Sequence, residues 1–291
     1  MSEGIKDHPG LSDAAAQSRA SVLRSRAESY IALSRHEAAI ADLTESIALV
    51  PDHARSWRLR GESHRVIERY EAALADFDEA LRLEPDSAYA LGSRGQTYAA
   101  MSRLEEAMDD FEHALTLAPD SLWILEAKAE LLVDLDRLDE ALHEYAKIIA
   151  QNEELAYSWV ARGDLYQRMH QYEEAIADYT KALAADPEYV RALSRRGEAL
   201  RMTDRYEEAL ADLNRALELD PENDRAFGSR GAVLSELGDN EAALRDLNRA
   251  IDLDPEYIWA YRVRGEIQQE LERHEEAVAD FTQALHLEFG D

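Results

Sequence analysis

The residues of this chain that could do chemistry are not grouped as they are in catalytic sites. The chain has nine histidines and no cysteine, so it can form neither disulfides nor thiolate metal sites. His143 and Glu144 resemble the start of a zinc-protease motif, but Lys147 stands where the second histidine would be. A glycine-rich phosphate loop is also missing. The sequence therefore predicts no catalytic residue, no metal site, no cofactor and no enzymatic activity.

Charged residues recur at a fixed interval, which favours structural ion pairs over reactive groups. A basic residue occurs every 34 residues, and an acidic residue follows each of them sixteen positions later. The basic set is Arg26, Arg60, Arg94, Lys128, Arg162, Arg196, Arg230 and Arg264, and the acidic set is Asp42, Asp76, Asp110, Glu144, Asp178, Asp212, Asp246 and Asp280. Because each arginine has a carboxylate at matched spacing, we interpret the sets as a ladder between helices and not as phosphate ligands.

The elements that carry these charges repeat with the same period. Six of the seven prolines share one position of the period, and Glu153 interrupts their series: Pro51, Pro85, Pro119, Pro187, Pro221 and Pro255. A second position is always alanine: Ala39, Ala73, Ala107, Ala141, Ala175, Ala209, Ala243 and Ala277. A third is glycine or alanine: Ala27, Gly61, Gly95, Ala129, Gly163, Gly197, Gly231 and Gly265. Such regularity indicates an array of one repeated unit.

One unit, residues 190–223, reads as two amphipathic helices. Apolar or small residues occur at helical spacing from about Val190 to Thr203 and again from about Glu207 to Leu219. A turn of three or four residues joins the two stretches, and Pro221 cannot continue the second helix. The small residues leave no side chain between the helices, so their axes can approach closely.

These positions resemble the tetratricopeptide repeat over residues 20–291. The resemblance implies an all-α fold: a right-handed superhelical α-solenoid of antiparallel helix pairs, with a concave groove lined by the first helix of each pair. The expected units are 20–53, 54–87, 88–121, 122–155, 156–189, 190–223, 224–257 and 258–291. Residues 1–19 are expected to form an N-terminal tail, disordered over 1–11, that runs into a first helix capped by Ser12 and ending near Leu33.

The resemblance places the second, fifth, ninth, twelfth and thirteenth residues of each unit on the concave face. The candidate partner-binding residues are Arg55, Arg58, Arg65, Tyr89, Trp123, Tyr157, Arg191, Arg195, Arg201, Arg225 and Trp259. Arginine and large aromatic residues are enriched at binding hot spots. We expect Tyr89, Trp123 and Tyr157 to form an apolar floor. We expect the basic stretch of Arg191, Arg195, Arg201 and Arg225 to bind carboxylates. The alternative is solvated side chains paired with groove glutamates, as in Arg58 and Glu62.

One branch of the family clamps the C-terminal carboxylate of chaperone tails with basic residues and asparagines from three units. Arg191 and Arg195 match the last element of that clamp only. Glu126 and Glu130 occupy earlier clamp positions, where their charge would repel a carboxylate. The sequence therefore argues against a clamp of this kind.

Composition narrows the class of partner. A net charge of −29 argues against binding to nucleic acid and to anionic membranes. No apolar run approaches the ~20 residues of a membrane span, and the N-terminus lacks a signal peptide, so we expect cytoplasmic residence. The leading hypothesis is a non-catalytic scaffold that binds a peptide or helical segment of a protein in the groove. The alternative is a self-assembling or regulatory (sensor) module of a larger multidomain protein.

Residues 122–155 depart most from the repeat. Ala129 replaces a glycine, Ile148 replaces a small residue and Glu153 replaces the proline. Without the proline, the second helix is expected to run on toward Glu154, with a change in the superhelix near 148–156. The alternative is that neighbouring side chains repack to accommodate these residues.

The C-terminal repeat predicts a self-association surface. Val278, Phe281 and Leu285 would normally receive a following unit, so either the chain is a piece of a longer protein or this end stacks on another molecule. An exposed apolar end face favours association between copies.

Overall fold

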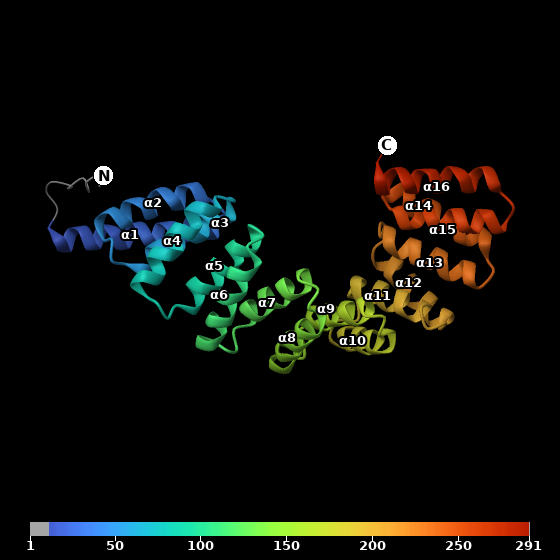
Figure 1. Cartoon of the computed structure of the whole chain (residues 1–291), viewed down its shortest axis with the longest axis horizontal. Helices are drawn as coiled ribbons and strands as arrows, with labels where there is room; N and C mark the ends of the chain where they lie inside the picture. The colour runs from blue at the N-terminus through green and yellow to red at the C-terminus, as the bar shows by residue number, and fades with distance from the viewer. Residues whose placement is uncertain (1–11, 291) are drawn as a thin grey trace. The chain divides into compact units, whose positions relative to one another are not determined.

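A computed structural model describes residues 12–290, within which sixteen α-helices follow one another and no strand occurs (Figure 1). The odd-numbered helices are α1 (Asp13–Ala32), α3 (Ala54–Val66), α5 (Ala88–Ala100), α7 (Leu122–Asp134), α9 (Ala156–Arg168), α11 (Val190–Arg201), α13 (Asp224–Glu236) and α15 (Ile258–Glu270). The even-numbered helices are α2 (His36–Leu49), α4 (Tyr70–Leu83), α6 (Leu104–Leu117), α8 (Leu138–Gln151), α10 (Tyr172–Ala185), α12 (Tyr206–Leu219), α14 (Asn240–Leu253) and α16 (His274–Phe289). The predicted all-α solenoid of helix pairs is confirmed.

The chain divides after Arg137 into two compact units. The first unit contains α1 to α7, and the second contains α8 to α16. Within a unit the two helices of a pair pack on each other, and both pack on the first helix of the next pair.

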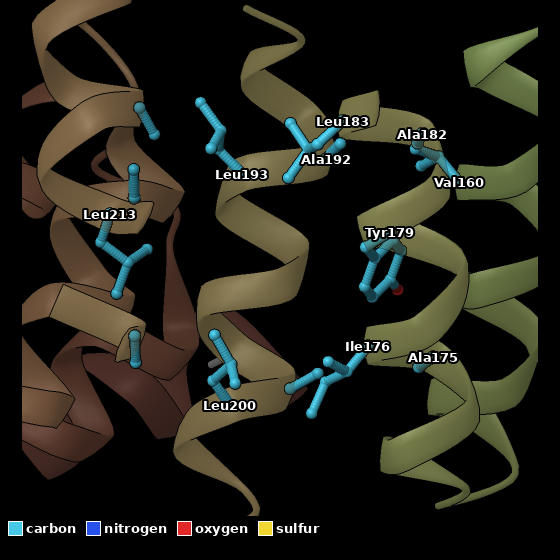
Figure 2. Packing of buried hydrophobic residues seen from close by; sticks show 14 of the residues in the cluster. Val160, Ala175, Ile176, Tyr179, Ala182, Leu183, Ala192, Leu193, Leu200 and Leu213 are labelled. Atoms are coloured by element: carbon cyan, nitrogen blue, oxygen red, sulfur yellow. The ribbon is translucent and has the colours of Figure 1, made fainter. Parts of the chain in front are cut away.

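The two helices of a pair approach closely where the sequence has its small residues. A Cβ atom added to Gly95 would lie 2.8 Å from the ring of Phe111, and one added to Gly197 would lie 2.7 Å from Leu213. Figure 2 shows the corresponding core of the second unit, in which Tyr179, Leu200 and Leu213 fill the space between helices. The eight recurring alanines are also buried. The predicted close packing is confirmed.

The predicted charge ladder is confirmed for seven of its eight pairs. Each arginine donates two hydrogen bonds to its aspartate from Nε and Nη2, at distances of 2.5–2.9 Å. Lys128 and Glu144 belong to the same repeat, but Lys128 lies in the first compact unit and Glu144 in the second. Lys128 lies 3.8 Å from Glu112, and Glu144 accepts a hydrogen bond of 2.8 Å from Lys147.

Five of these arginines also bind the preceding helix pair, which the sequence analysis did not predict. Their Nη1 atoms donate to Thr44, Asp78, Thr180, Asn214 and Asn248. Each guanidinium therefore joins three helices: its own, the following one and the preceding one. This arrangement gives the arginines a structural role.

The turns inside the helix pairs share a backbone conformation. One residue in each turn has a positive φ, three positions after α11 and two positions after every other odd-numbered helix. It is glycine only at Gly238: the others are Ser34, Glu68, Ser102, Asp136, His170, Asp204 and Glu272. A residue with a Cβ atom pays a steric cost in this left-handed region. Predicted turn length is confirmed, since residues 202–205 separate α11 from α12.

The predicted extension of the helix at Glu153 is wrong. Helix α8 ends at Gln151, and its 14 residues match the length of α6 and α10. The side chain of Asn152 accepts a hydrogen bond of 3.0 Å from the backbone of Glu154. Asp186 makes the equivalent contact with Glu188. This side-chain turn ends the helix whether or not proline follows.

The two ends of the described chain agree in part with expectation. Helix α1 is capped by Ser12, whose hydroxyl accepts from the Ala15 amide, and ends at Ala32 as predicted. The predicted disorder of 1–11 lies outside the described residues. In α16, Val278 and Leu285 are exposed, but Phe281 is partly buried because its ring packs against Gly265. Phe281 therefore contributes less exposed area to this face than Val278 and Leu285, and self-association stays a prediction.

Candidate functional site

The first unit places an arginine and two aromatic rings in series on three successive odd-numbered helices. The guanidinium of Arg58 on α3 lies 4.2 Å from the ring centroid of Tyr89 on α5. The centroids of Tyr89 and Trp123 on α7 are 5.2 Å apart. Gly92 allows this contact, because a Cβ atom there would overlap the indole ring. Arg58, Tyr89 and Trp123 form what we call the aromatic series.

The other predicted arginines of this unit are paired. Arg55 lies 2.9 Å from Glu28, and Arg65 lies 2.5 Å from Glu62. The expected Arg58–Glu62 pair does not form, since Glu62 binds Arg65 and Arg58 stacks on Tyr89. The alternative of solvated ion pairs therefore describes Arg55 and Arg65 but not Arg58.

Tyr157 lies on α9 in the second unit, where 40% of it is exposed. Within the first unit the predicted apolar floor therefore consists of the two rings of Tyr89 and Trp123. The sequence predicted these two rings correctly as neighbours.

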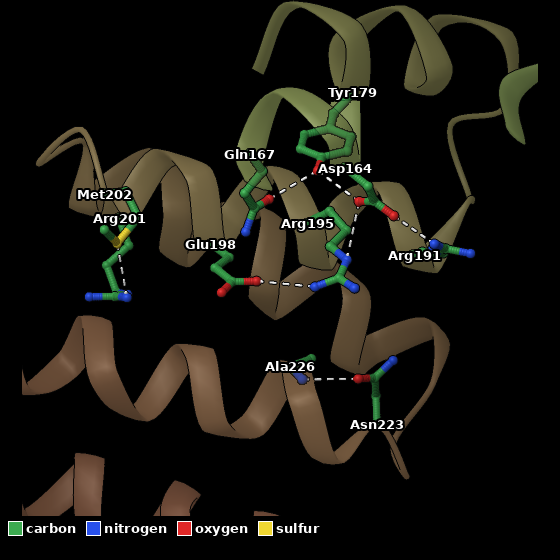
Figure 3. A network of polar contacts seen from close by, with 10 residues as sticks. All are labelled: Asp164, Gln167, Tyr179, Arg191, Arg195, Glu198, Arg201, Met202, Asn223 and Ala226. Atoms are coloured by element: carbon green, nitrogen blue, oxygen red, sulfur yellow. Dashed lines mark hydrogen bonds and ion pairs between the residues drawn. The ribbon is translucent and has the colours of Figure 1, made fainter. Parts of the chain in front are cut away.

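The second unit gathers polar side chains around Asp164 on α9 (Figure 3). Its carboxylate lies 2.6 Å from Arg191 and 3.3 Å from Arg195, and it accepts a hydrogen bond of 2.8 Å from the hydroxyl of Tyr179. Arg195 also lies 3.4 Å from Glu198. Burial raises the pKa of Tyr179, and the negative charge of Asp164 raises it further. The hydroxyl therefore stays protonated and donates to the carboxylate that holds both arginines.

A cavity of about 680 Å³ adjoins this network and lies between α11, α13 and α15. We call it the central cavity. Its lining includes Arg191, Ser194, Arg195, Arg225, Tyr257 and Trp259. The rings of Tyr257 and Trp259 lie 5.8 Å apart, and both lie against Gly228. Cavities of this volume are typical of ligand sites in proteins.

Two smaller cavities share residues with the central cavity. One, of about 350 Å³, shares Arg195 and Glu198 and extends over Asp164 and Gln167. The other, of about 320 Å³, shares Trp259 and extends between Arg201 and Glu270. The three cavities therefore adjoin one another along α9, α11, α13 and α15. All five predicted residues from Arg191 to Trp259 line them: Arg191, Arg195, Arg225 and Trp259 line the central cavity, and Arg201 lines the third.

Arg201 and Arg225 differ in their surroundings. Arg201 donates a 3.2 Å contact to the sulfur of Met202, and its buried Nε has no hydrogen-bond partner. Arg225 is exposed and has no ion pair within residues 12–290. Of the predicted basic stretch, Arg191 and Arg195 thus already hold carboxylates, whereas Arg225 does not.

Tyr257, Ser194 and Asn223 line the central cavity but were not predicted. A signal for the ring positions exists in the sequence. In both compact units a glycine at the fifth position of one repeat precedes a tryptophan at the second position of the next: Gly92 lies 31 residues before Trp123, and Gly228 lies 31 residues before Trp259. Because glycine has no side chain, it leaves room on its helix for the ring of the next odd-numbered helix.

Metal chemistry and membrane insertion find no support among the described residues. No group of three or more histidine or acidic side chains in residues 12–290 could hold a metal ion. No helix in the same range combines the length and apolar character needed to cross a membrane.

Comparison with known families and structures agrees with the geometry. A family model described as a tetratricopeptide repeat matches residues 24–81, 63–121 and 160–224, and one described as a TPR repeat matches 231–272. No curated protein is similar enough in sequence to count as a relative.

Solved structures show the same fold at low sequence identity. A tetratricopeptide repeat protein from Parabacteroides merdae is 22% identical, with a TM-score of 0.68 over 82% of this chain and 94% of that one. The APC/C hetero-tetramer Cut9-Hcn1 gives 15% identity and a TM-score of 0.62, over 93% of this chain and 53% of that one. MamA from Desulfovibrio magneticus is 22% identical, with a TM-score of 0.50 over 57% and 94% of the two chains. These likenesses establish the fold alone.

Proposed function

Because the chain belongs to the tetratricopeptide repeat family, whose members bind protein partners, we propose that it is a non-catalytic scaffold for protein–protein interaction. We propose further that the row of three cavities in the second unit holds an extended or helical segment of the partner. Arg191, Arg195, Arg201, Arg225 and Trp259 are the residues expected to contact it.

The observation that carries this proposal is the sharing of residues between neighbouring cavities. Arg195 and Glu198 line both the first cavity and the central one, and Trp259 lines both the central cavity and the third. A small molecule would fill one such hollow, whereas a peptide presents successive side chains to all three. Tryptophan and arginine at the shared positions are the types that dominate binding energy at interfaces.

The first unit offers a second contact region through the aromatic series of Arg58, Tyr89 and Trp123. Tyr89 is 46% exposed, so its ring is available to a partner. Arg55 and Arg65 flank the series but are already paired with glutamates. We propose that this region adds apolar contact area.

Peptide selection tests the proposed function. A phage-displayed library of random 16-residue peptides is selected on the full chain, and the tightest peptide is labelled for fluorescence anisotropy. We expect Trp259→Ala to raise the Kd at least about tenfold, as hot-spot truncations do. Arg245→Ala is the matched control because Arg245 is exposed on α14, outside the cavities. An unchanged Kd in Trp259→Ala, Trp123→Ala and Tyr157→Ala would refute the site.

One observation favours the alternative of self-association. Val278, Leu285 and Phe289 lie on one face of α16 and are 64%, 57% and 74% exposed. An apolar helix face of this kind is typical of contacts between copies. Sedimentation velocity at rising concentration tests it: association that Val278→Glu abolishes supports the alternative, and a monomer at all concentrations removes it.

A further inference from the structure

The central cavity has more hydrogen-bond donors than acceptors. Glu198 and Asp220 are its two carboxylates, and both are engaged: Glu198 by Arg195, and Asp220 by the side chain of Asn223 and the backbone of Glu222. The carboxylate of Asp164 pairs with both Arg191 and Arg195 and also accepts a hydrogen bond from Tyr179. The arginines of the cavity therefore keep N–H groups that no acceptor in the described chain uses.

Two groups in the wall are specifically without an acceptor. Arg225 forms no ion pair among the described residues. The hydroxyl oxygen of Ser194 is buried and has no hydrogen-bond partner. A buried polar group left unpaired costs free energy, so a ligand that pairs it gains affinity.

Two aromatic rings also line the same cavity. Tyr257 and Trp259 lie against Gly228, and the hydroxyl of Tyr257 has Glu198 and Arg225 near it. Burial raises the pKa of Tyr257, so this hydroxyl is a neutral donor at physiological pH. The cavity thus combines hydrogen-bond donors for an anionic oxygen with an apolar surface formed by the two rings.

From this arrangement we infer that the central cavity binds an acidic side chain, aspartate or glutamate, next to a large apolar side chain within a peptide of the partner. Arg225 and Ser194 receive the carboxylate, and Tyr257 and Trp259 receive the apolar neighbour. The inference rests on the proposed function and specifies the ligand class of the same site.

The ligand is an internal side chain and not a chain end. The cavity shares Arg195 with a second cavity and Trp259 with a third, so a peptide that occupies it has room to continue in both directions. An amidated peptide, which lacks a terminal carboxylate, is therefore expected to bind as well as the free acid. This distinguishes the site from one that clamps a C-terminus.

A double-mutant cycle between protein and peptide tests the inference. The probe is the tightest 16-residue peptide selected on the full chain, made with a C-terminal amide and a fluorescein label. Its acidic residues are replaced one at a time, Glu by Gln or Asp by Asn, and each peptide is titrated against the native chain and Arg225→Gln. We expect one acidic residue whose loss raises the Kd about tenfold, and an effect of Arg225→Gln that disappears for that neutral peptide.

Controls separate this inference from the proposed function. Arg249 is exposed on α14, outside the cavities, so Arg249→Gln should leave every Kd unchanged. If Trp259→Ala weakens binding but Arg225→Gln and the acidic replacements act independently or have no effect, the ligand class is wrong and the scaffold function stands. If no selected peptide depends on Trp259, Arg191 or Arg225, the proposed site and this inference fail together. Circular dichroism confirms that each variant is folded.

Discussion

At the residue scale, the arginine–aspartate ladder is the most regular interaction in the chain. Arg196 and Asp212 represent it, with donor–acceptor distances of 2.7 and 2.8 Å and with 22% and 11% of their side chains exposed. Bidentate pairs of this kind are stronger than exposed ion pairs, because both groups are fixed and partly shielded from water.

A double-mutant cycle on Arg196→Ala and Asp212→Ala should show this coupling. We expect an interaction free energy of roughly 1–3 kcal/mol, measured from urea unfolding midpoints. The exposed pair Arg205–Glu208 serves as the control and should show little coupling. Coupling near zero at Arg196 would contradict the structural role of the ladder.

Tyr179 gives a second prediction at this scale, through its pH dependence. Its pKa is raised by burial, so the folded state holds the hydroxyl proton more tightly than the unfolded state. Stability from this group is therefore present below the ordinary tyrosine pKa of about 10 and falls as pH rises above it. The urea midpoint should fall between pH 8 and pH 11 in the native chain, and it should fall by less in Tyr179→Phe. An equal loss of stability in both proteins would contradict the assignment.

At the element scale, the left-handed turns predict opposite effects for two substitutions. Ser102 and Gly238 occupy equivalent turns with φ of 58° and 82°. Ser102→Gly should raise stability and Gly238→Ala should lower it, each by about 1 kcal/mol, because only glycine adopts this region freely. Gly238 has no atom within 4 Å of an added Cβ, so contacts do not confuse the result. Urea midpoints that do not change in opposite directions would contradict this reading.

The helix pairs could be predicted from sequence because the spacing of prolines and small residues reflects local rules. The positive φ at residues such as Asp204 could not, since serine, aspartate, glutamate and histidine carry no signal as clear as glycine. The helix end at Gln151 was mispredicted because the side chain of Asn152, and not the missing proline, terminates α8.

The candidate site was predictable in composition but not in pairing. The sequence identified Arg191, Arg195, Arg225 and Trp259, yet it could not show that Asp164 already holds two of these arginines. Tyr257 was missed because it precedes α15 and lies outside the positions that the repeat assigns to the groove. Such contacts depend on distances between repeats, which periodicity does not encode.

At the scale of the whole molecule, the net charge of −29 predicts a salt effect on stability. Surplus acidic charge repels itself in the folded state, and salt screens this repulsion over about 10 Å at 0.1 M. The ladder is less affected because its aspartates are buried. We expect the thermal midpoint to rise between 20 and 300 mM sodium chloride. A midpoint that falls would mean that surface ion pairs outweigh the repulsion.

The central claim is that the odd-numbered helices of the second unit hold the partner segment. Photo-crosslinking tests it most directly, with a selected peptide that carries benzophenone at its middle residue and mass spectrometry to locate the attachment. We expect crosslinks within α11, α13 and α15, and their loss when unlabelled peptide competes. Competable crosslinks confined to α10, α12 and α14 would contradict it.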